Sequence, residues 1–223
     1  MRDCPDVAMM FCAGLGTRMG NLTRSRPKPL IDVGGKPLAA HALSQLDRIS
    51  RVVANTHYKR DLMEAWLCSA GLDSIYEPEL LETGGGLKNA LPLLASDCVL
   101  TINTDAVWSG PTASSILCDA WDPERMDALL LLVPLSRAHA FRGKGDFDMA
   151  AGRIEKRGGP FVYTGAQILD TNTLDSIAED RFSLNLVWEE LLAKGRLHGV
   201  EYPGDWVDVG HPDGITEAEG LLG

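Results

Sequence analysis

The chain has 223 residues, of which 45% are hydrophobic and 23% are charged, so it can bury the core of one α/β domain but not of two independent domains. It carries 21 Lys and Arg against 31 Asp and Glu, a formal net charge of −10. This acidic balance argues against non-specific binding to nucleic acid or to an anionic membrane surface.

The cysteines and the amino-terminal segment bear on the compartment. Five cysteines lie at positions 4, 12, 68, 98 and 118, without a CxxC pair. An odd number with this spacing favours neither a disulfide framework nor a zinc site, and it predicts a reducing compartment. The apolar run 7–15 is too short for a membrane span, and the aspartates before it are atypical of a signal peptide. We therefore expect a cytoplasmic protein.

Short apolar runs alternate with longer amphipathic ones through the first 135 residues. The predicted strands are 7–12, 51–55, 74–76, 99–103 and 128–133. Helical spacing fits residues 37–48, 59–70, 86–94 and 112–121. This alternation predicts an α/β fold with a doubly wound, mainly parallel, Rossmann-like sheet.

The rhythm changes at about residue 136, where shorter runs are punctuated by glycine. Strands are predicted at 147–150, 153–155, 161–169 and 197–202, and helices at 184–194 and 212–222. Pro212 suits the first turn of the last helix, and Asp213 suits its positive end. We expect this part to form a small lobe over the carboxyl edge of the sheet, where open α/β sheets bind ligands.

A glycine-containing turn follows the first predicted strand, with the sequence AGLGTRM at 13–19. Met19 stands in place of the third glycine of the dinucleotide fingerprint, and no Gly-Lys-Ser/Thr follows, so neither the Rossmann motif nor the P-loop is matched. The N–H groups of such a turn can still approach phosphate oxygens, and Arg18 can add a charge-assisted contact. An ordinary strand-to-helix turn with a solvated arginine is the alternative.

Basic residues are concentrated after this turn. Residues 13–36 contain five Lys and Arg but only one acidic residue, which suits a small anion. Pro27 and Pro29 restrict the backbone on both sides of Lys28 and so hold its ammonium in one place. The alternative interpretation is a solvated basic loop.

A second glycine loop has the sequence ETGGG at 82–86. Three consecutive glycines lose much conformational entropy on folding, and a flat base lying against the bare backbone would explain them. Glu82 could help to select the polar edges of such a ligand. A flexible connection between two elements is the alternative.

Two aspartates lie next to or within apolar runs. Asp105 follows the strand that ends at Asn103, and Asp208 lies within WVDVG at 206–210. A carboxylate in such a position is costly unless it is paired or bound to a cation. Two of them facing one cleft would suit Mg²⁺, which takes oxygen ligands and shares them with substrate phosphates. Each alone could be a helix cap or an ion-pair partner.

The motifs GLGTRM, PKPL, ETGGG, NTD and WVDVG, in this order, resemble those of the sugar-1-phosphate nucleotidyltransferases. Within that family, ETGGGLKNALPLL, GKGDF at 143–147 and YTGAQIL at 163–169 look most like the short bacterial N-acetylmuramate 1-phosphate uridylyltransferases of peptidoglycan recycling. Two features depart from the family pattern. Thr104 replaces a glycine that many members have, and the EKP motif of larger relatives is missing.

The resemblance implies attack of a sugar 1-phosphate on the α-phosphorus of a nucleoside triphosphate, with UTP favoured. Positioning and charge neutralisation then supply the catalysis, because no protein nucleophile is required. By the same resemblance, residues 1–135 bind the nucleotide and residues 136–223 the sugar, within one domain.

Roles for individual residues also follow from the resemblance. The implied catalytic residues are Arg18, Lys28, Asp105 and Asp208, of which the two aspartates hold Mg²⁺. The implied nucleotide contacts are Ala13, Gly14, Gly16, Thr17, Gly84 and Asn103. The implied substrate contacts are Glu82, Asp146, Thr164 and Gly165. If the sugar is a muramate, its lactyl carboxylate needs a cation, for which the candidates are Arg142, Lys144 and Arg157, although these could equally form a solvated basic loop.

Three other functions stay open. A mannose-1-phosphate guanylyltransferase would share the same motifs. A non-catalytic nucleotide-sugar sensor could share the fold, but it would have little reason to keep both aspartates. A Rossmann oxidoreductase could share the sheet, but the second predicted strand ends at Asn55 without the expected acidic residue.

Overall fold

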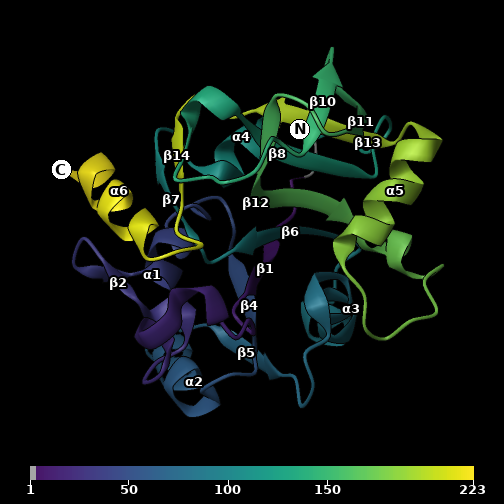
Figure 1. The fold of residues 1–223 in the computed structure, drawn as a ribbon. Helices are drawn as coiled ribbons and strands as arrows, with labels where there is room; N and C mark the ends of the chain where they lie inside the picture. The colour runs from purple at the N-terminus through teal and green to yellow at the C-terminus, as the bar shows by residue number, and fades with distance from the viewer. Residues whose placement is uncertain (1–3) are drawn as a thin grey trace.

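The computed structural model of the chain describes residues 4–223 and is built around one nine-stranded sheet (Figure 1). In spatial order, the strands are β10 (Phe147–Ala150), β11 (Arg153–Arg157), β13 (Leu197–Glu201), β8 (Ala128–Pro134), β12 (Phe161–Asp170), β6 (Cys98–Asn103), β1 (Val7–Phe11), β4 (Arg51–Thr56) and β5 (Asp73–Tyr76). The prediction of an α/β fold is confirmed.

Four neighbouring strands, β6, β1, β4 and β5, are parallel, so their carboxyl ends lie at one edge. β12 runs antiparallel to both of its main neighbours, β6 and β8, whereas β13 is parallel to β8. The direction of β12 is not predictable from its apolar pattern, which a buried parallel strand would share. Because β12 lies between β6 and β8, the residues after 135 extend the same sheet.

Helices cover both faces of the sheet. The helices on one face are α1 (Leu38–Leu43), α2 (Arg60–Ser69) and α4 (Ala113–Ala120). Those on the other face are α3 (Glu82–Leu94) and α5 (Leu184–Lys194), which lie together in Figure 1. In β1, Ala8 and Met10 pack into the first layer, while Val7 and Met9 pack into the second. Both faces of the strand are therefore buried, as its continuous apolar sequence indicates.

α1 ends five residues before the predicted boundary at 48, and the reason lies in α4. The side-chain amide oxygen of Gln45 accepts from the N–H of Ala113, and the Asp47 carboxylate accepts from the hydroxyls of Thr112 and Ser114. These bonds serve the amino-terminal turn of α4, whose N–H groups have no partner within the helix. The hydrogen-bonding needs of a neighbouring helix thus override the local helical pattern.

A smaller layer lies beside the carboxyl ends of the parallel strands. Its strands are β7 (Ala106–Ser109), β14 (Asp205–Asp208) and β9 (Ala138–His139), in the order β7-β14-β9. Around it lie η1 (Thr17–Thr23), η2 (Lys28–Leu30), the β2 and β3 hairpin (Asp32–Val33 and Lys36–Pro37) and α6 (Asp213–Leu222). Two further short helices are η3 (Leu135–Arg137) and η4 (Thr171–Leu174). The small layer brings residues near 105 and 208 side by side, because Ala106 of β7 pairs with Asp208 of β14.

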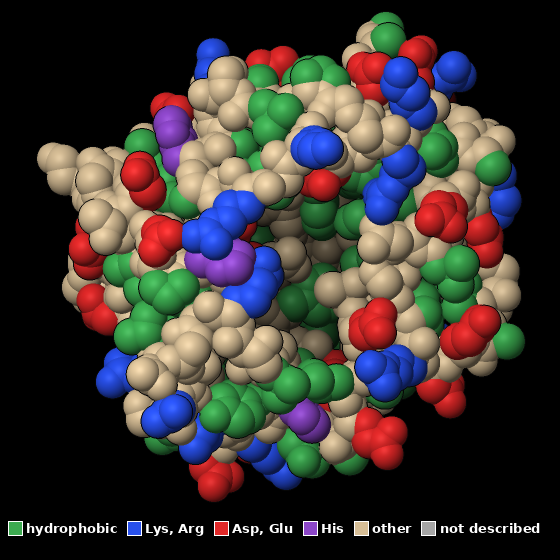
Figure 2. Space-filling model, viewed as in Figure 1, with side chains coloured by type: hydrophobic (Ala, Val, Ile, Leu, Met, Phe, Trp, Pro, Cys, Tyr) green, Lys and Arg blue, Asp and Glu red, His purple; other side chains and the backbone are tan. Residues whose placement is uncertain are grey.

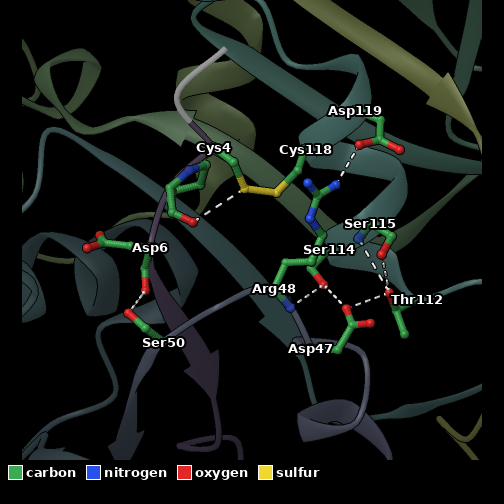
Figure 3. Close-up of a disulfide and its surroundings, with 11 residues drawn as sticks. Cys4, Asp6, Asp47, Arg48, Ser50, Thr112, Ser114, Ser115, Cys118 and Asp119 are labelled. Carbon is green, nitrogen blue, oxygen red and sulfur yellow. Dashed lines mark hydrogen bonds and ion pairs between the residues drawn. A yellow bond between two sulfur atoms is a disulfide. The ribbon is translucent and has the colours of Figure 1, made fainter. Parts of the chain in front are cut away.

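A disulfide joins Cys4, which precedes β1, to Cys118 on α4 (Figure 3). The cysteine pattern, which favours no disulfide framework, therefore fails to indicate this bond. The two half-cystines are 114 residues apart and have a Cα–Cα distance of 5.0 Å, a pairing that local spacing cannot indicate. Cys12, Cys68 and Cys98 are free. The inference of a reducing compartment loses this support. Within residues 4–223, no helix has the length and apolar character needed to cross a bilayer.

We expect reduction of the disulfide to lower the free energy of unfolding by about 2–4 kcal/mol, because the bond restricts the unfolded chain. Urea denaturation with and without dithiothreitol measures this difference. Cys118→Ser should be insensitive to the reductant. A titration of the denatured wild type that finds five thiols before reduction would show that the bond does not form.

Candidate active site

Two adjoining cavities lie at the carboxyl ends of the parallel strands. The first has a volume of about 330 Å³ and the second about 550 Å³. They share three lining residues, Phe11, Thr83 and Asn103, which come from β1, α3 and β6. Figure 2 shows the molecule hollowed near its middle, with Lys and Arg side chains on the rim. This edge of an open α/β sheet is the usual place for a ligand.

The glycine turn after β1 packs directly on the Pro-Lys-Pro segment. Gly16 has a φ of +63°, and a Cβ there would lie 2.8 Å from the Cβ of Lys28 and 2.9 Å from the methyl group of Thr23. Any other side chain would therefore be strained and would displace Lys28. The backbone of the turn also lines the first cavity, through Ala13, Gly14 and Gly16. The two motifs thus form one unit that fixes the position of a lysine.

Asp105 and Asp208 meet where β7 and β14 pair. The N–H of Val209 donates to the backbone oxygen of Asp105 at 2.8 Å, and Lys28 Nζ donates to Asp105 Oδ2 at 3.1 Å. Burial and the nearby Asp105 carboxylate raise the pKa of Asp208, while Lys28, the N–H of Gly210 and Arg18 act in the opposite direction. All four predicted catalytic residues therefore converge on one place.

The donor set of this carboxylate pair suits a hard cation. Two carboxylates offer oxygen ligands, and their mutual repulsion would be relieved by a positive charge between them. Among residues 4–223, no group of three or more His, Cys, Asp or Glu side chains is placed to hold a metal ion. A cation here would complete its shell with water and phosphate oxygens, as Mg²⁺ commonly does.

The floor of the first cavity contains two buried polar residues that sequence reasoning missed, Asn55 and Glu77. Asn55 Oδ1 accepts from the N–H of Cys12 at 2.8 Å, and Asn55 Nδ2 donates to Glu77 Oε1 at 2.7 Å. Glu77 Oε2 accepts from the N–H of Leu81 at 3.3 Å. Both residues stand at the carboxyl ends of parallel strands, β4 and β5, so the rule that indicated Asp105 could have found them.

Thr104 and Cys12 line the same cavity. The Thr104 hydroxyl donates to the backbone oxygen of Phe11 at 2.7 Å and so ties the end of β6 to the end of β1. This bond gives a structural reason for threonine where the family pattern has glycine. Burial raises the pKa of the Cys12 thiol to about 12, so Cys12 is not a thiolate nucleophile at neutral pH.

The second cavity combines aromatic rings with charged side chains. The centroid of the Trp188 ring lies 4.8 Å from that of Tyr163 and 5.8 Å from that of Phe147. The Asp146 carboxylate accepts from the N–H of Tyr163 at 2.9 Å, and Arg157 lies over Phe147 and Trp188. Such a mixture of rings and polar groups is typical of carbohydrate-sized ligands that need orientation.

Most of the residues implied by the resemblance lie at these cavities. Those that line the first cavity are Ala13, Gly14, Gly16, Lys28, Glu82, Asn103 and Asp105. Those that line the second cavity are Arg18, Asn103 and Asp146. Thr17 is exposed at the start of η1 and lines neither cavity. Of the five basic residues at 13–36, only Arg18 and Lys28 line the cavities; the others are exposed.

The close neighbour of Gly84 and Gly85 in the structure is the segment before α5 and not a base. The N–H groups of Gly84 and Gly85 both donate to the backbone oxygen of Phe182, at 2.9 and 3.0 Å. A Cβ on Gly84 would lie 2.3 Å from the Phe182 ring, and one on Gly85 would lie 2.2 Å from the backbone oxygen of Asp180. The glycines therefore let the segment before α5 pack on the first turn of α3, and Gly84 does not line either cavity.

Thr164 and Gly165 are not among the residues that line the second cavity, and their contact with the sugar stays a prediction. The Thr164 hydroxyl is buried and donates to the backbone oxygen of Leu131 at 2.7 Å. Gly165 has a φ of +90° and packs against the Asn103 side chain, where the register between β12 and β8 shifts. These residues shape an irregularity of the strand that positions Asn103.

The fold and the paired carboxylates beside two cavities define a nucleotidyltransferase, and comparisons with known proteins agree. Residues 8–167 match the family model described as the MobA-like NTP transferase domain, and the chain belongs to that family. It is 36% identical to an N-acetylmuramate alpha-1-phosphate uridylyltransferase of Caulobacter vibrioides, over 100% of this chain and 99% of that protein. The resemblance stated from the motifs is confirmed.

Two further comparisons cover most of the chain. A mannose-1-phosphate guanylyltransferase of Mycobacterium tuberculosis is 31% identical, over 96% of this chain and 64% of that protein. The solved structure of an inositol-1-phosphate CTP transferase from T. maritima superposes with a TM-score of 0.81 at 17% identity, over 100% of this chain and 96% of that one. At this identity, the superposition supports the fold alone.

We expect Gly85→Ala to lower the free energy of unfolding by about 1–3 kcal/mol, because the new methyl group meets a backbone oxygen that cannot move away freely. Gly220→Ala is the matched control. Gly220 also lies in a helix, nothing lies within 4 Å of its added Cβ, and alanine should be neutral or stabilising there. Urea denaturation of both variants measures the difference, and equal stabilities would contradict this role for Gly85.

Proposed function

We propose that the chain is a Mg²⁺-dependent uridylyltransferase that joins UTP and N-acetylmuramate 1-phosphate, releases pyrophosphate and acts in peptidoglycan recycling in the cytoplasm. The observation that carries the proposal is the convergence of four residues: Lys28 and Asp105 line the first cavity, Arg18 lines the second, and Asp208 lines neither but lies close to the other three. The Caulobacter relative, which covers the full chain, favours the uridylyl and muramate specificity.

The two cavities suit the two substrates. In this proposal the uridine lies in the first cavity, above the Asn55 and Glu77 pair, and the sugar lies in the second cavity against Tyr163 and Trp188. Asn103 and Thr83 line both cavities, so the reacting phosphates would meet beside them. This arrangement holds the nucleophile and the α-phosphate side by side, which lowers the entropic cost of their reaction.

The reaction needs no bond to the protein. An oxygen of the sugar 1-phosphate attacks the α-phosphorus, and the bond to the bridging oxygen breaks, so pyrophosphate leaves with the electron pair. Lys28 and Arg18 stand where they can meet the charge that grows on the leaving group. Asp105 and Asp208 would hold Mg²⁺, which when bound neutralises charge on the α-phosphate. Lys28 donates to Asp105 in this structure. A bound cation would therefore compete with Lys28 for the Asp105 carboxylate, and a phosphate would compete with Asp105 for the Lys28 ammonium.

A mannose-1-phosphate guanylyltransferase is the second candidate, favoured by the Mycobacterium relative. Pyrophosphate release measured over a panel of nucleoside triphosphates and sugar 1-phosphates separates the two. Release only with GTP and mannose 1-phosphate would overturn the proposed specificity and leave nucleotidyl transfer intact. A chain that binds nucleotide sugars without releasing pyrophosphate from any pair would be a sensor.

We expect Asp105→Asn and Asp208→Asn each to lower kcat by roughly 10²-fold or more, because each removes a charge that stabilises the transition state at similar volume. Asp205→Asn is the matched control, since Asp205 lies on the same strand but contacts His139. Thermal denaturation checks that all three variants fold. Wild-type Mg²⁺-dependent turnover in either site variant would remove that residue from the mechanism.

We also expect Arg18→Ala and Lys28→Ala to slow the chemical step more than they weaken sugar-phosphate binding, because both cations are proposed to meet charge on the departing pyrophosphate. Arg26→Ala and Lys36→Ala are controls, as both residues belong to the same basic segment but line neither cavity. Single-turnover kinetics measures the step directly. An unchanged rate in both site variants would make the glycine turn purely structural.

A further inference from the structure

One cation of the second cavity, Arg157, takes no part in the proposed transfer of the nucleotide. Arg157 lies at the end of β11 and lines that cavity, together with Asn185 and Trp188 of α5. It is distant in sequence from every motif of the phosphate site. The role of Arg157 therefore has to be inferred from the residues around it.

The Arg157 guanidinium is held by neighbours that leave its charge unpaired. Its central carbon lies 4.7 Å from the centroid of the Phe147 ring and 5.6 Å from that of Trp188, and Nη2 donates to Asn185 Oδ1 at 2.6 Å. Among the ion pairs formed within residues 4–223, none includes Arg157. In a chain of net charge −10, a positioned arginine without a carboxylate is poised to bind an anion.

The two other candidate cations, Arg142 and Lys144, are placed differently. Arg142 Nη2 donates to Asp213 Oδ2 at 2.5 Å on the exposed surface, so its charge is already paired. Lys144 is exposed, and neither Arg142 nor Lys144 lines the second cavity. Only Arg157 combines a place in the cavity with an unpaired charge.

The rest of the cavity limits what the anion can be. The reacting phosphates already have Arg18, Lys28 and the cation site beside the two aspartates. Asp146 is the acidic residue that lines this cavity, and its carboxylate would repel an anion but can accept from hydroxyls of a sugar. A ligand with hydroxyls at one side and a carboxylate at the other matches both groups.

We infer that Arg157 binds a carboxylate on the sugar and so makes this site selective for acidic N-acetylhexosamine 1-phosphates over neutral ones. The inference rests on the proposed function and names the group that sets its sugar specificity. The planar fork of the guanidinium suits two parallel hydrogen bonds to a carboxylate, while the rings beneath it fix its plane.

The test compares kcat/KM for N-acetylmuramate 1-phosphate and N-acetylglucosamine 1-phosphate, with UTP, in the wild type and in Arg157→Gln. The ratio of the two values should fall at least about tenfold in the variant, the lower end for a charge-assisted contact, with the neutral sugar little affected. Arg157→Lys should keep part of the preference, because it keeps the charge but not the fork. Arg142→Gln should leave the ratio unchanged.

A second measurement uses the wild type alone and does not depend on the folding of a variant. Both sugars carry the same phosphate, so the salt dependence of phosphate binding cancels in the ratio of the two kcat/KM values. A contact between the exposed Arg157 and a carboxylate does not cancel, and it should weaken as salt is added. The preference should therefore shrink as the ionic strength rises. Calorimetric titration with UDP-N-acetylmuramate and UDP-N-acetylglucosamine gives the same comparison without turnover.

The outcomes separate the two claims. A wild type that does not use N-acetylmuramate 1-phosphate overturns the proposed function, and the inference with it. The inference alone is overturned if the wild type prefers the muramate but Arg157→Gln lowers kcat/KM equally for both sugars, or for neither. A preference that does not change with salt also counts against it.

Discussion

The structure around the site depends on one electrostatic constraint, the approach of the Asp105 and Asp208 carboxylates. Burial raises the pKa of Asp208, and the nearby Asp105 carboxylate raises it further, so ionisation of both groups is disfavoured. Their approach is imposed by the backbone pairing of β7 with β14. Lys28 then has to stand beside them, and its position follows from the prolines around it and from the close packing of Gly16 against it.

The same constraint explains why so many short elements surround the site. The pairing of β7 with β14 needs a core of its own, and the small cluster that includes Met19, Val107, Val207 and Ala218 supplies it. None of these segments could be stable alone, because two or three short strands bury too little apolar surface. The small layer is therefore a support for two carboxylates and a lysine, built against the edge of a larger sheet.

How far the sequence predicts this protein depends on which interactions are local. The long apolar strands and α5 are evident from residue patterns, because each buries a face that its own periodicity shows. β14 has only four residues, and nothing in its pattern says that it pairs with β7, nearly one hundred positions earlier. The glycines of α3 show the same limit. Their sequence indicates that something lies close to the backbone, but only the tertiary structure shows that Gly84 meets Phe182, Gly85 meets Asp180 and Gly86 meets Glu77.

The disulfide between Cys4 and Cys118 changes the topology of the chain. Residues 4–118 form a covalently closed ring, and only the remainder of the chain leaves it as a tail. The ring contains both glycine motifs, Lys28 and Asp105, whereas Asp208 and Arg157 belong to the tail. While the bond is intact, a single peptide cleavage anywhere between positions 5 and 117 opens the ring without releasing a fragment. By contrast, one cleavage in the tail between position 118 and Asp208 leaves Asp208 and its partner Asp105 on two separate fragments.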